Sequence, residues 1–95
     1  MSPIFEWNRR KAASNRKKHG VSFEEALTVF ADPLARIFDD EEHSDEELRE
    51  IIIGHSKAQR LLVVSFAEGR DSIRIFSARK GTRQERQDYE EDVTS

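Results

Sequence analysis

The 95-residue sequence contains no cysteine, one tryptophan, one tyrosine, two prolines and four scattered glycines. Without cysteine the chain forms no disulfide bond and no thiolate metal site, and the dispersed glycines form no phosphate-cradling loop. The longest unbroken apolar run, Leu61 to Val64, is far too short to span a membrane. Because the first residues also lack the apolar core of a signal peptide, we expect a cytoplasmic protein with no membrane partner.

The charges are separated along the chain, although they sum to a net charge of only −3. The segment Arg9 to His19 holds six arginines and lysines and no acid, whereas Asp39 to Glu50 holds eight acids and one arginine. Arg70 to Arg86 is basic again. Local fields of this kind steer charged ligands, so each run is either a binding surface or simply a solvated face. The apolar residues between them come in periodic blocks, and the length fits one domain, residues 1–95.

The first residues predict a short strand over 4–7 and a helix over 9–18. Asn8 is a good N-cap for this helix. His19 and Gly20 close it, the first as a cation near the negative helix end and the second as a residue free to adopt left-handed φ. The helix holds only two alanines as apolar residues, so it buries little.

A second helix is predicted after Val21, where Ser22 and Glu25 match a capping box. Asp32-Pro33 ends it, because the residue before a proline disfavours the helical conformation. Its apolar residues recur at i, i+3, i+4 and i+7 and so form one helical face: Phe23, Ala26, Leu27 and Phe30.

The rest of the chain predicts four strands and a last helix. An acidic loop over 39–47 separates the first two strands, and short turns join the others, which favours an antiparallel arrangement. Leu61 to Val64 is apolar on both faces and is therefore expected in a central strand. Thr82 and Glu85 match a capping box for the C-terminal helix. We expect an α+β fold with strands over 34–38, 49–55, 60–67 and 71–78.

Cationic side chains and the single tyrosine gather where the last strand meets the C-terminal helix. Arginine binds phosphate bidentately and stays charged, so this cluster suits a phosphate-bearing ligand such as RNA. Helical spacing allows three of these residues to share a face of the helix. The cluster consists of Arg74, Arg79, Lys80, Arg83, Arg86 and Tyr89.

Motifs spread from Phe5 to about Glu91 make the sequence resemble the BrnT toxins of bacterial type II toxin–antitoxin modules. Each motif is weak alone, and the ordered set at this length is specific. The motifs are Phe5-x-Trp7, Lys11, Asn15, the run from Lys18 to Ala26, Val29-Phe30-x-Asp32-Pro33, Ile53-Gly54, Ile75-x-Ser77-Ala78-Arg79, Thr82, Glu85-Arg86 and Tyr89-Glu90.

This resemblance implies a fold similar to the RelE-type ribonuclease toxins, with two N-terminal helices packed on an antiparallel sheet and a C-terminal helix. It implies a BrnT-like toxin domain that cleaves RNA and blocks translation. The implied partner is a BrnA-type antitoxin, whose ribbon-helix-helix part binds operator DNA and thereby represses the operon. A non-catalytic partner-binding module acting in that repression is the alternative, and a non-catalytic RNA-binding protein is a third possibility.

Metal-free RNA cleavage needs a base for the 2′-hydroxyl, cations for the crowded phosphate and an acid for the leaving oxygen. We therefore expect no cofactor and no metal, since the spacing of His43 and His55 among the acids matches no metal site. The candidate catalytic residues are Arg79, Arg74, Tyr89 and Arg83. The candidate RNA-binding residues are Lys11, Lys18, His19, Lys80 and Arg86.

Structural roles are open alternatives for the same residues. Arg79 is also a candidate for a structural ion pair, and Tyr89 for a core anchor of the last helix. Arg83 and Arg86 have carboxylates near them in sequence. Lys11 and Lys18 are otherwise solvated, and His19 is otherwise a helix-end cation.

Overall fold

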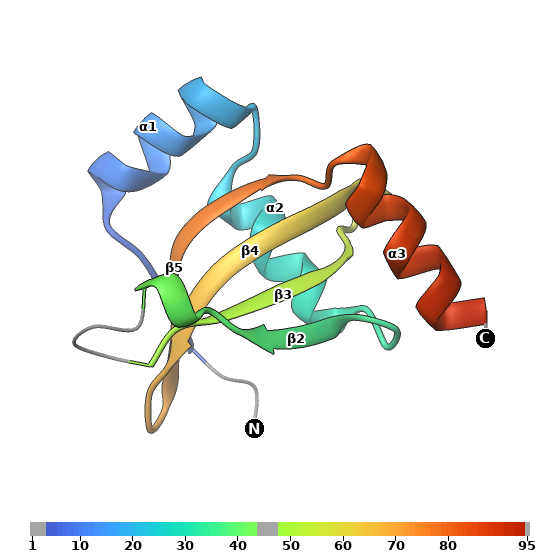
Figure 1. Ribbon diagram of the computed structural model, residues 1–95. Helices are drawn as coiled ribbons and strands as arrows, with labels where there is room; N and C mark the ends of the chain where they lie inside the picture. Colours follow the sequence, from blue (N-terminus) through green and yellow to red (C-terminus); the bar gives the residue numbers. More distant parts are fainter. Residues whose placement is uncertain (1–3, 44–47, 95) are drawn as a thin grey trace.

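The computed structural model describes residues 4–43 and 48–94, and it has the element order that the sequence predicts (Figure 1). Residues 44–47 of the predicted acidic loop lie outside the described residues. Two short 3₁₀ helices, η1 and η2, join the predicted elements. In chain order the elements are β1 (Ile4–Glu6), α1 (Arg9–His19), α2 (Phe23–Leu27), η1 (Thr28–Ala31), β2 (Arg36–Asp39), η2 (Glu41–His43), β3 (Glu50–His55), β4 (Leu61–Glu68), β5 (Ser72–Lys80) and α3 (Arg83–Thr94).

The strands form one five-stranded sheet in the order β1-β5-β4-β3-β2. Neighbours from β2 to β5 are antiparallel, as predicted, but β1 pairs with β5 in parallel, with Phe5 opposite Ile73. The expectation of a purely antiparallel sheet is therefore wrong, and the sheet is mixed. The reason is topological: both helices and three strands intervene between β1 and β5, so no tight turn forces these two strands to run in opposite directions.

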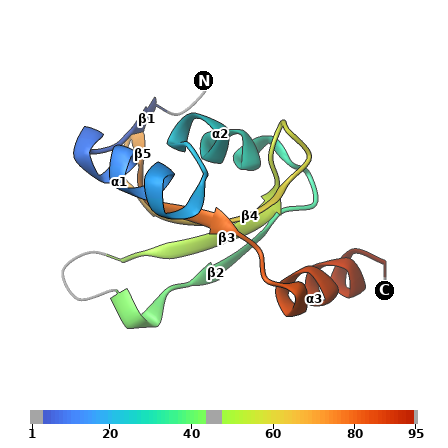
Figure 2. The same ribbon diagram turned by 90° about the horizontal axis from the view of Figure 1, so that it is seen from above.

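Apolar side chains pack on both faces of the sheet. The helices α1 and α2 lie over one face and α3 lies over part of the other (Figure 2). The central strand β4 serves both cores in alternation, because Leu62 and Val64 pack with the first helices while Leu61 and Val63 pack with Tyr89 of α3. The prediction that this strand is covered on both faces is confirmed.

The second predicted helix is a five-residue α2 that tightens into η1 and ends before Asp32. Ser22 Oγ accepts the N–H of Glu25 at 3.1 Å, as a helix cap should. No bond from the Glu25 carboxylate back to the Ser22 N–H is seen in the described part of the chain. That carboxylate instead accepts hydrogen bonds from Arg60 and from Ser56 Oγ at 2.7 Å. The predicted capping box is thus only half formed here, because Arg60 offers a charged partner.

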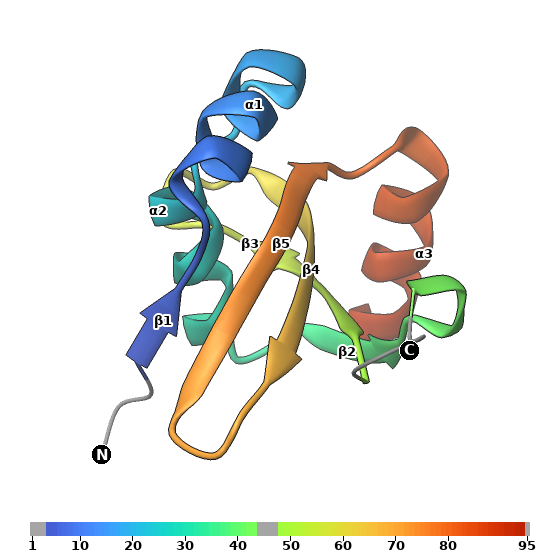
Figure 3. The same ribbon diagram turned by 90° about the vertical axis from the view of Figure 1, so that its left-hand side faces the viewer.

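The helix α1 is anchored to the sheet by an amide rather than by an apolar face. Asn8 caps it, and Gly20 ends it with a φ of 69°. Asn15 Nδ2 donates to the carbonyl of Ala78 at 2.8 Å, and the Ala78 N–H donates to Asn15 Oδ1 at 3.1 Å. This amide side chain pairs with β5 as a neighbouring strand would. The pairing lies beyond the point where β1 ends, since β1 pairs with β5 only as far as Arg74, and Figure 3 shows β5 continuing past β1 toward α1. A third bond, from Nδ2 to the Val21 carbonyl at 3.1 Å, fixes the start of α2.

A β-bulge in β5 changes which side chains face the helices. Ser65 pairs with Ser77 and Phe66 with Ile75, so Phe76 is an extra residue with no partner across the strands. Before the bulge Ile75 belongs to the core under α1 and α2, and after it Ala78 does. Phe76, Ser77 and Arg79 therefore all lie on the opposite face of the sheet. In a strand without the bulge, Ser77 and Arg79 would point toward the core under α1 and α2.

Candidate functional site: a basic cleft

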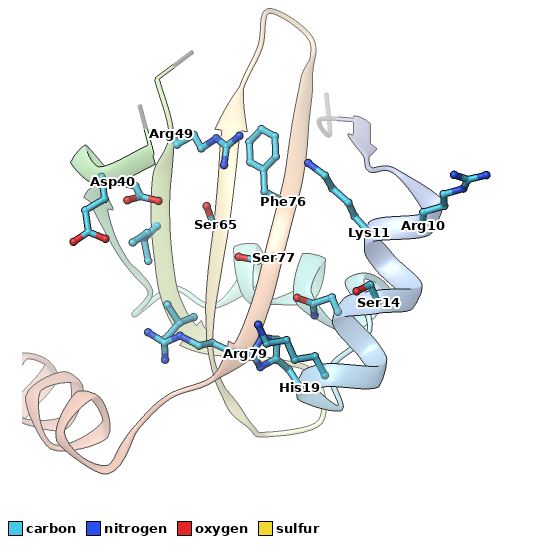
Figure 4. Close-up of a pocket in the computed structure, with 15 residues that line it drawn as sticks. Arg10, Lys11, Ser14, His19, Asp40, Arg49, Ser65, Phe76, Ser77 and Arg79 are labelled. Carbon is cyan, nitrogen blue, oxygen red and sulfur yellow. The ribbon is translucent and has the colours of Figure 1, made fainter. Parts of the chain in front are cut away.

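A cleft of about 710 Å³ lies between α1, η2 and the face of β3, β4 and β5 that α3 leaves uncovered (Figure 4). Cationic side chains outnumber acidic ones around it. The acids are Asp40 and Glu42, the cations are Arg10, Lys11, Lys18, Arg49 and Arg79, and His19 also lines the cleft. An open cleft with this excess of positive charge attracts anions, even though the whole chain has a net charge of −3.

One wall of the cleft is the polar helix α1. Lys11, Ser14 and Lys18 follow each other at i, i+3 and i+7 and so lie on one stripe of the helix, which faces the cleft. His19 lies half-buried at the end of this stripe. The structure therefore brings together the predicted RNA-binding residues of α1, and their binding role remains a prediction.

The floor of the cleft combines an aromatic ring with hydroxyl groups. Phe76 lies beside Ser65 and Ser77 on this face. The guanidinium carbon of Arg49 lies 3.9 Å from the centroid of the Phe76 ring, and the Lys11 ammonium lies 5.6 Å from it. These distances are within the range of cation–π attraction.

Arg79 lines the cleft but is held by α3. Its Nη1 and Nη2 donate to the two carboxylate oxygens of Glu85 at 2.7 and 2.9 Å. Glu85 also closes the capping box predicted with Thr82, since it accepts the Thr82 N–H at 2.8 Å while Thr82 Oγ1 accepts the Glu85 N–H at 3.1 Å. The Arg79 guanidinium and, to a lesser degree, Thr82 lower the pKa of Glu85 to about 2 against the opposing effect of burial.

The other arginines of the predicted cluster do not converge on the cleft. Arg74 points to the same face as Arg79, but roughly 15 Å of strand separates them, and Arg74 Nη2 lies 3.4 Å from Glu6 Oε1 on β1. Arg83 and Arg86 are exposed on α3, which leads away from α1 (Figure 4), and Lys80 is exposed at the end of β5. The expectation of one pocket formed by all these side chains is therefore wrong, because α3 turns back along β3 and β4.

Tyr89 lies outside the cleft as well. Its ring is buried against Ile53, Leu61 and Val63, and its hydroxyl donates to Asp32 Oδ2 at 3.0 Å. Burial, together with the Asp32 carboxylate, raises the pKa of Tyr89 to about 12. This geometry agrees with the alternative of a core anchor, since the phenol keeps its proton at neutral pH and faces the interior.

Asp32 is a junction that sequence reasoning treated only as a helix stop. Its Oδ2 accepts the backbone N–H of His55 at 2.8 Å in addition to the Tyr89 hydroxyl, and Oδ1 accepts the N–H of Leu34 at 2.9 Å. Burial favours the neutral carboxyl, but these donors outweigh it and lower the pKa of Asp32. One carboxylate thus ties together the end of η1, the end of β3 and α3.

Five residues were not predicted as site residues, although two of them, Asn15 and Ser77, belong to the motifs: Arg49, Phe76, Ser65, Ser77 and Asn15. Arg49, Ser65 and the adjacent pair Phe76-Ser77 lie far apart in sequence and meet only through the pairing of the strands. One signal was present: Phe76 directly follows the inward Ile75 and breaks the alternation of the strand, as residues at bulges do.

Residues 4–43 and 48–94 contain neither a metal-binding group of side chains nor a membrane-spanning helix. No three histidine, aspartate or glutamate side chains there lie together so as to hold a metal ion. In the same residues, no helix has the length and apolar character to cross a membrane.

The fold and the cleft define a small α+β protein with a cation-lined surface suited to an anionic ligand. Residues 7–85 match the family described as "Ribonuclease toxin, BrnT, of type II toxin-antitoxin system", and the chain belongs to this family. The crystal structure of the Brucella abortus ribonuclease toxin BrnT has a similar fold, with a TM-score of 0.68 and 21% identity over 86% of this chain and 100% of that chain. No curated protein matches the sequence.

Proposed function

We propose that this protein is the toxin of a type II toxin–antitoxin module and a metal-independent endoribonuclease that inhibits translation. Membership of a family of ribonuclease toxins supports this proposal. The single observation that carries it is the cleft, in which cationic side chains from α1, from β5 and from Arg49 before β3 surround an open sheet surface. A flexible polyanion such as single-stranded RNA fits this arrangement, because it lies along an open groove and pairs with cations on both sides.

In the proposed reaction the 2′-hydroxyl of the RNA attacks the adjacent phosphorus and the 5′-oxygen leaves. Arg79 binds the phosphate as negative charge builds on it. The Glu85 carboxylate accepts one hydrogen bond from each terminal nitrogen of Arg79, and the Lys80 carbonyl accepts another from Nη1 at 3.2 Å. A guanidinium has five N–H donors, so Nε and one N–H of Nη2 are left for a phosphate.

Residues of α1 complete the proposed site. Lys11 and Lys18 bind the RNA backbone along the cleft wall. His19 is the candidate for proton transfer, because an imidazole is the side chain that most often does this in enzymes. The predicted catalytic roles of Arg74, Arg83 and Tyr89 have no support from geometry, since none of the three lines the cleft.

The proposed partner is a BrnA-type antitoxin with a ribbon-helix-helix part that binds operator DNA, so that this protein meets DNA only through its antitoxin. We place the complex in the cytoplasm and the fold near the RelE-type toxins, as the family resemblance implies. Neutralisation then means that the antitoxin closes the cleft or holds Arg79 in its ion pair with Glu85.

Induced expression without the antitoxin tests the proposal. We expect growth arrest with the unchanged protein, relief of the arrest by Arg79→Ala, and continued arrest by Arg83→Ala, a matched loss of one arginine outside the cleft. Purified protein should cleave RNA in the presence of EDTA, as expected for a reaction without a metal. Harmless expression together with intact RNA would contradict the proposal.

A non-catalytic partner-binding module is the second candidate, and two observations favour it. The edge strand β2 exposes Ile37 at 54% and Phe38 at 52%, and a strand edge with apolar side chains is a surface for another chain. Arg79 is already paired with Glu85. This candidate predicts that the protein binds its antitoxin normally but neither arrests growth nor cleaves RNA.

A further inference from the structure

The side chain of Phe76 is an aromatic ring that the protein core does not use. Phe5, Phe23, Phe30 and Phe66 all pack in or against the core under the first helices, whereas Phe76 belongs to neither apolar cluster. This half-buried ring lies on the floor of the basic cleft, and the bulge in β5 places Ser77 beside it on the same face. Core packing does not explain an apolar ring among the side chains of five arginines and lysines.

The surroundings of the ring match those of a stacking site for a nucleobase. Arg49 lies over the ring at 3.9 Å and Lys11 approaches at 5.6 Å, and the close-up view places them on either side of Phe76 (Figure 4). Both an aromatic ring and the flat guanidinium group of arginine offer surfaces on which unpaired bases stack. Lysine next to such a surface holds the phosphate that joins neighbouring nucleotides.

We propose that the Phe76–Arg49 pair is a binding site for one unpaired base of the RNA in the cleft. This inference rests on the proposed function and adds its substrate class: single-stranded RNA, or a loop, rather than a duplex. Bases inside a duplex are stacked on each other and present no free face, so a duplex meets the cleft only through its phosphates. The site selects for an exposed base and not for a particular one, because every base has a face that stacks.

The test compares two oligonucleotides of equal length and charge that cannot be cleaved because 2′-fluoro replaces the 2′-hydroxyl. One carries bases and the other is abasic. Stacking of one base on an aromatic side chain predicts that the unchanged protein binds the base-bearing strand about tenfold more tightly. Phe76→Leu should abolish this difference while leaving the affinity for the abasic strand unchanged, and Phe76→Trp should keep it.

Fluorescence gives a second reading of the same contact. The fluorescence of 2-aminopurine in an RNA strand should be quenched when the strand binds the unchanged protein or Phe76→Trp, but not when it binds Phe76→Leu. Circular dichroism and thermal unfolding check that each variant is folded. Should Phe76→Leu unfold, the abasic comparison on the unchanged protein and the Phe76→Trp variant still decide the matter.

The outcomes separate this inference from the proposed function. If the unchanged protein binds neither strand and cleaves no RNA, the proposed function fails and the base site fails with it. If it cleaves RNA but binds both strands equally, the base site is overturned and the proposed function stands. Equal affinity of Phe76→Leu and the unchanged protein for the base-bearing strand overturns the base site as well.

Discussion

At the scale of single residues, Glu85 links the stability of α3 to the state of the cleft. Its carboxylate caps the helix through Thr82 and holds Arg79 through two hydrogen bonds. Both interactions need the ionised form, which is why the pKa of Glu85 is lowered from 4.5 to about 2. A single carboxylate thus holds the start of α3 next to the cleft and keeps the cationic group of Arg79 in place.

This pKa predicts how stability depends on pH. The folded-state pKa lies below the unfolded value, so the stabilisation from Glu85 is complete above about pH 4.5 and is lost as the pH falls from 4.5 to 2. Glu85→Gln should therefore unfold more easily at pH 7, by about 1–2 kcal/mol, and should lose less stability over that acidic range. Urea unfolding at a series of pH values measures this. The same decline in both proteins would show that the ion pair contributes nothing.

Tyr89 provides a test of a structural against a catalytic role. Tyr89→Phe keeps the buried ring and removes the hydroxyl that donates to Asp32, so we expect a loss of about 1–2 kcal/mol in the free energy of unfolding. RNA cleavage by the folded variant should stay within about twofold of the unchanged protein, an effect worth well under 1 kcal/mol of barrier. A folded Tyr89→Phe protein that cleaves no RNA would instead support the catalytic role predicted from the sequence.

At the scale of elements, α1 is a polar helix that one buried side chain ties to the sheet. Asn15 is its buried residue, and the Asn15 amide makes three hydrogen bonds to backbone groups of Ala78 and Val21. Since α1 carries one wall of the cleft, this amide also sets the distance between that wall and the sheet.

Asn15→Ala should leave the N–H and the carbonyl of Ala78 without these partners and lower the free energy of unfolding by about 2–4 kcal/mol. Hydrogen exchange at the Ala78 amide should speed up more than exchange elsewhere in β5, because α1 separates from this edge first. Ser14→Ala, an exposed change in the same helix, is the control and should alter neither quantity. Unchanged protection of the Ala78 amide in Asn15→Ala would show that α1 is held by other contacts.

Local signals in the sequence predicted the elements well but not how they meet. Asn8, Gly20, Thr82 and Glu85 mark helix ends through contacts within a few residues, and these are visible in sequence. The parallel pairing of β1 and the amide bridge of Asn15 join residues far apart in the chain, so no local pattern reveals them.

The bulge at Phe76 limited the prediction of the site in the same way. Alternation along an unbroken strand puts Arg74 and Arg79 on opposite faces, whereas the extra residue puts them on one. Lys11, Lys18 and His19 could be predicted as binding residues from the sequence, because α1 has too little apolar surface to be a core helix. Arg49 could not be predicted in this way, since it reaches the cleft only through the pairing of β3 with β4.

At the scale of the whole molecule, the separation of charge matters more than the net charge of −3. Cations from α1 and β5, together with Arg49 just before β3, meet around the cleft beside the acids Asp40 and Glu42, whereas α3 is rich in acids away from it. We therefore expect RNA to bind in the cleft rather than elsewhere on the surface, with an affinity that falls as the salt concentration rises.

The most direct test of this central claim is the salt dependence of affinity for an uncleavable single-stranded RNA in two charge-matched double variants. Lys11→Gln with Lys18→Gln removes two cations from the cleft, and Arg83→Gln with Arg86→Gln removes two from α3. We expect the slope of log affinity against log salt to weaken by about 1.4 in the first variant and not to change in the second. Equal weakening in both, or weakening only in the α3 variant, would contradict binding in the cleft.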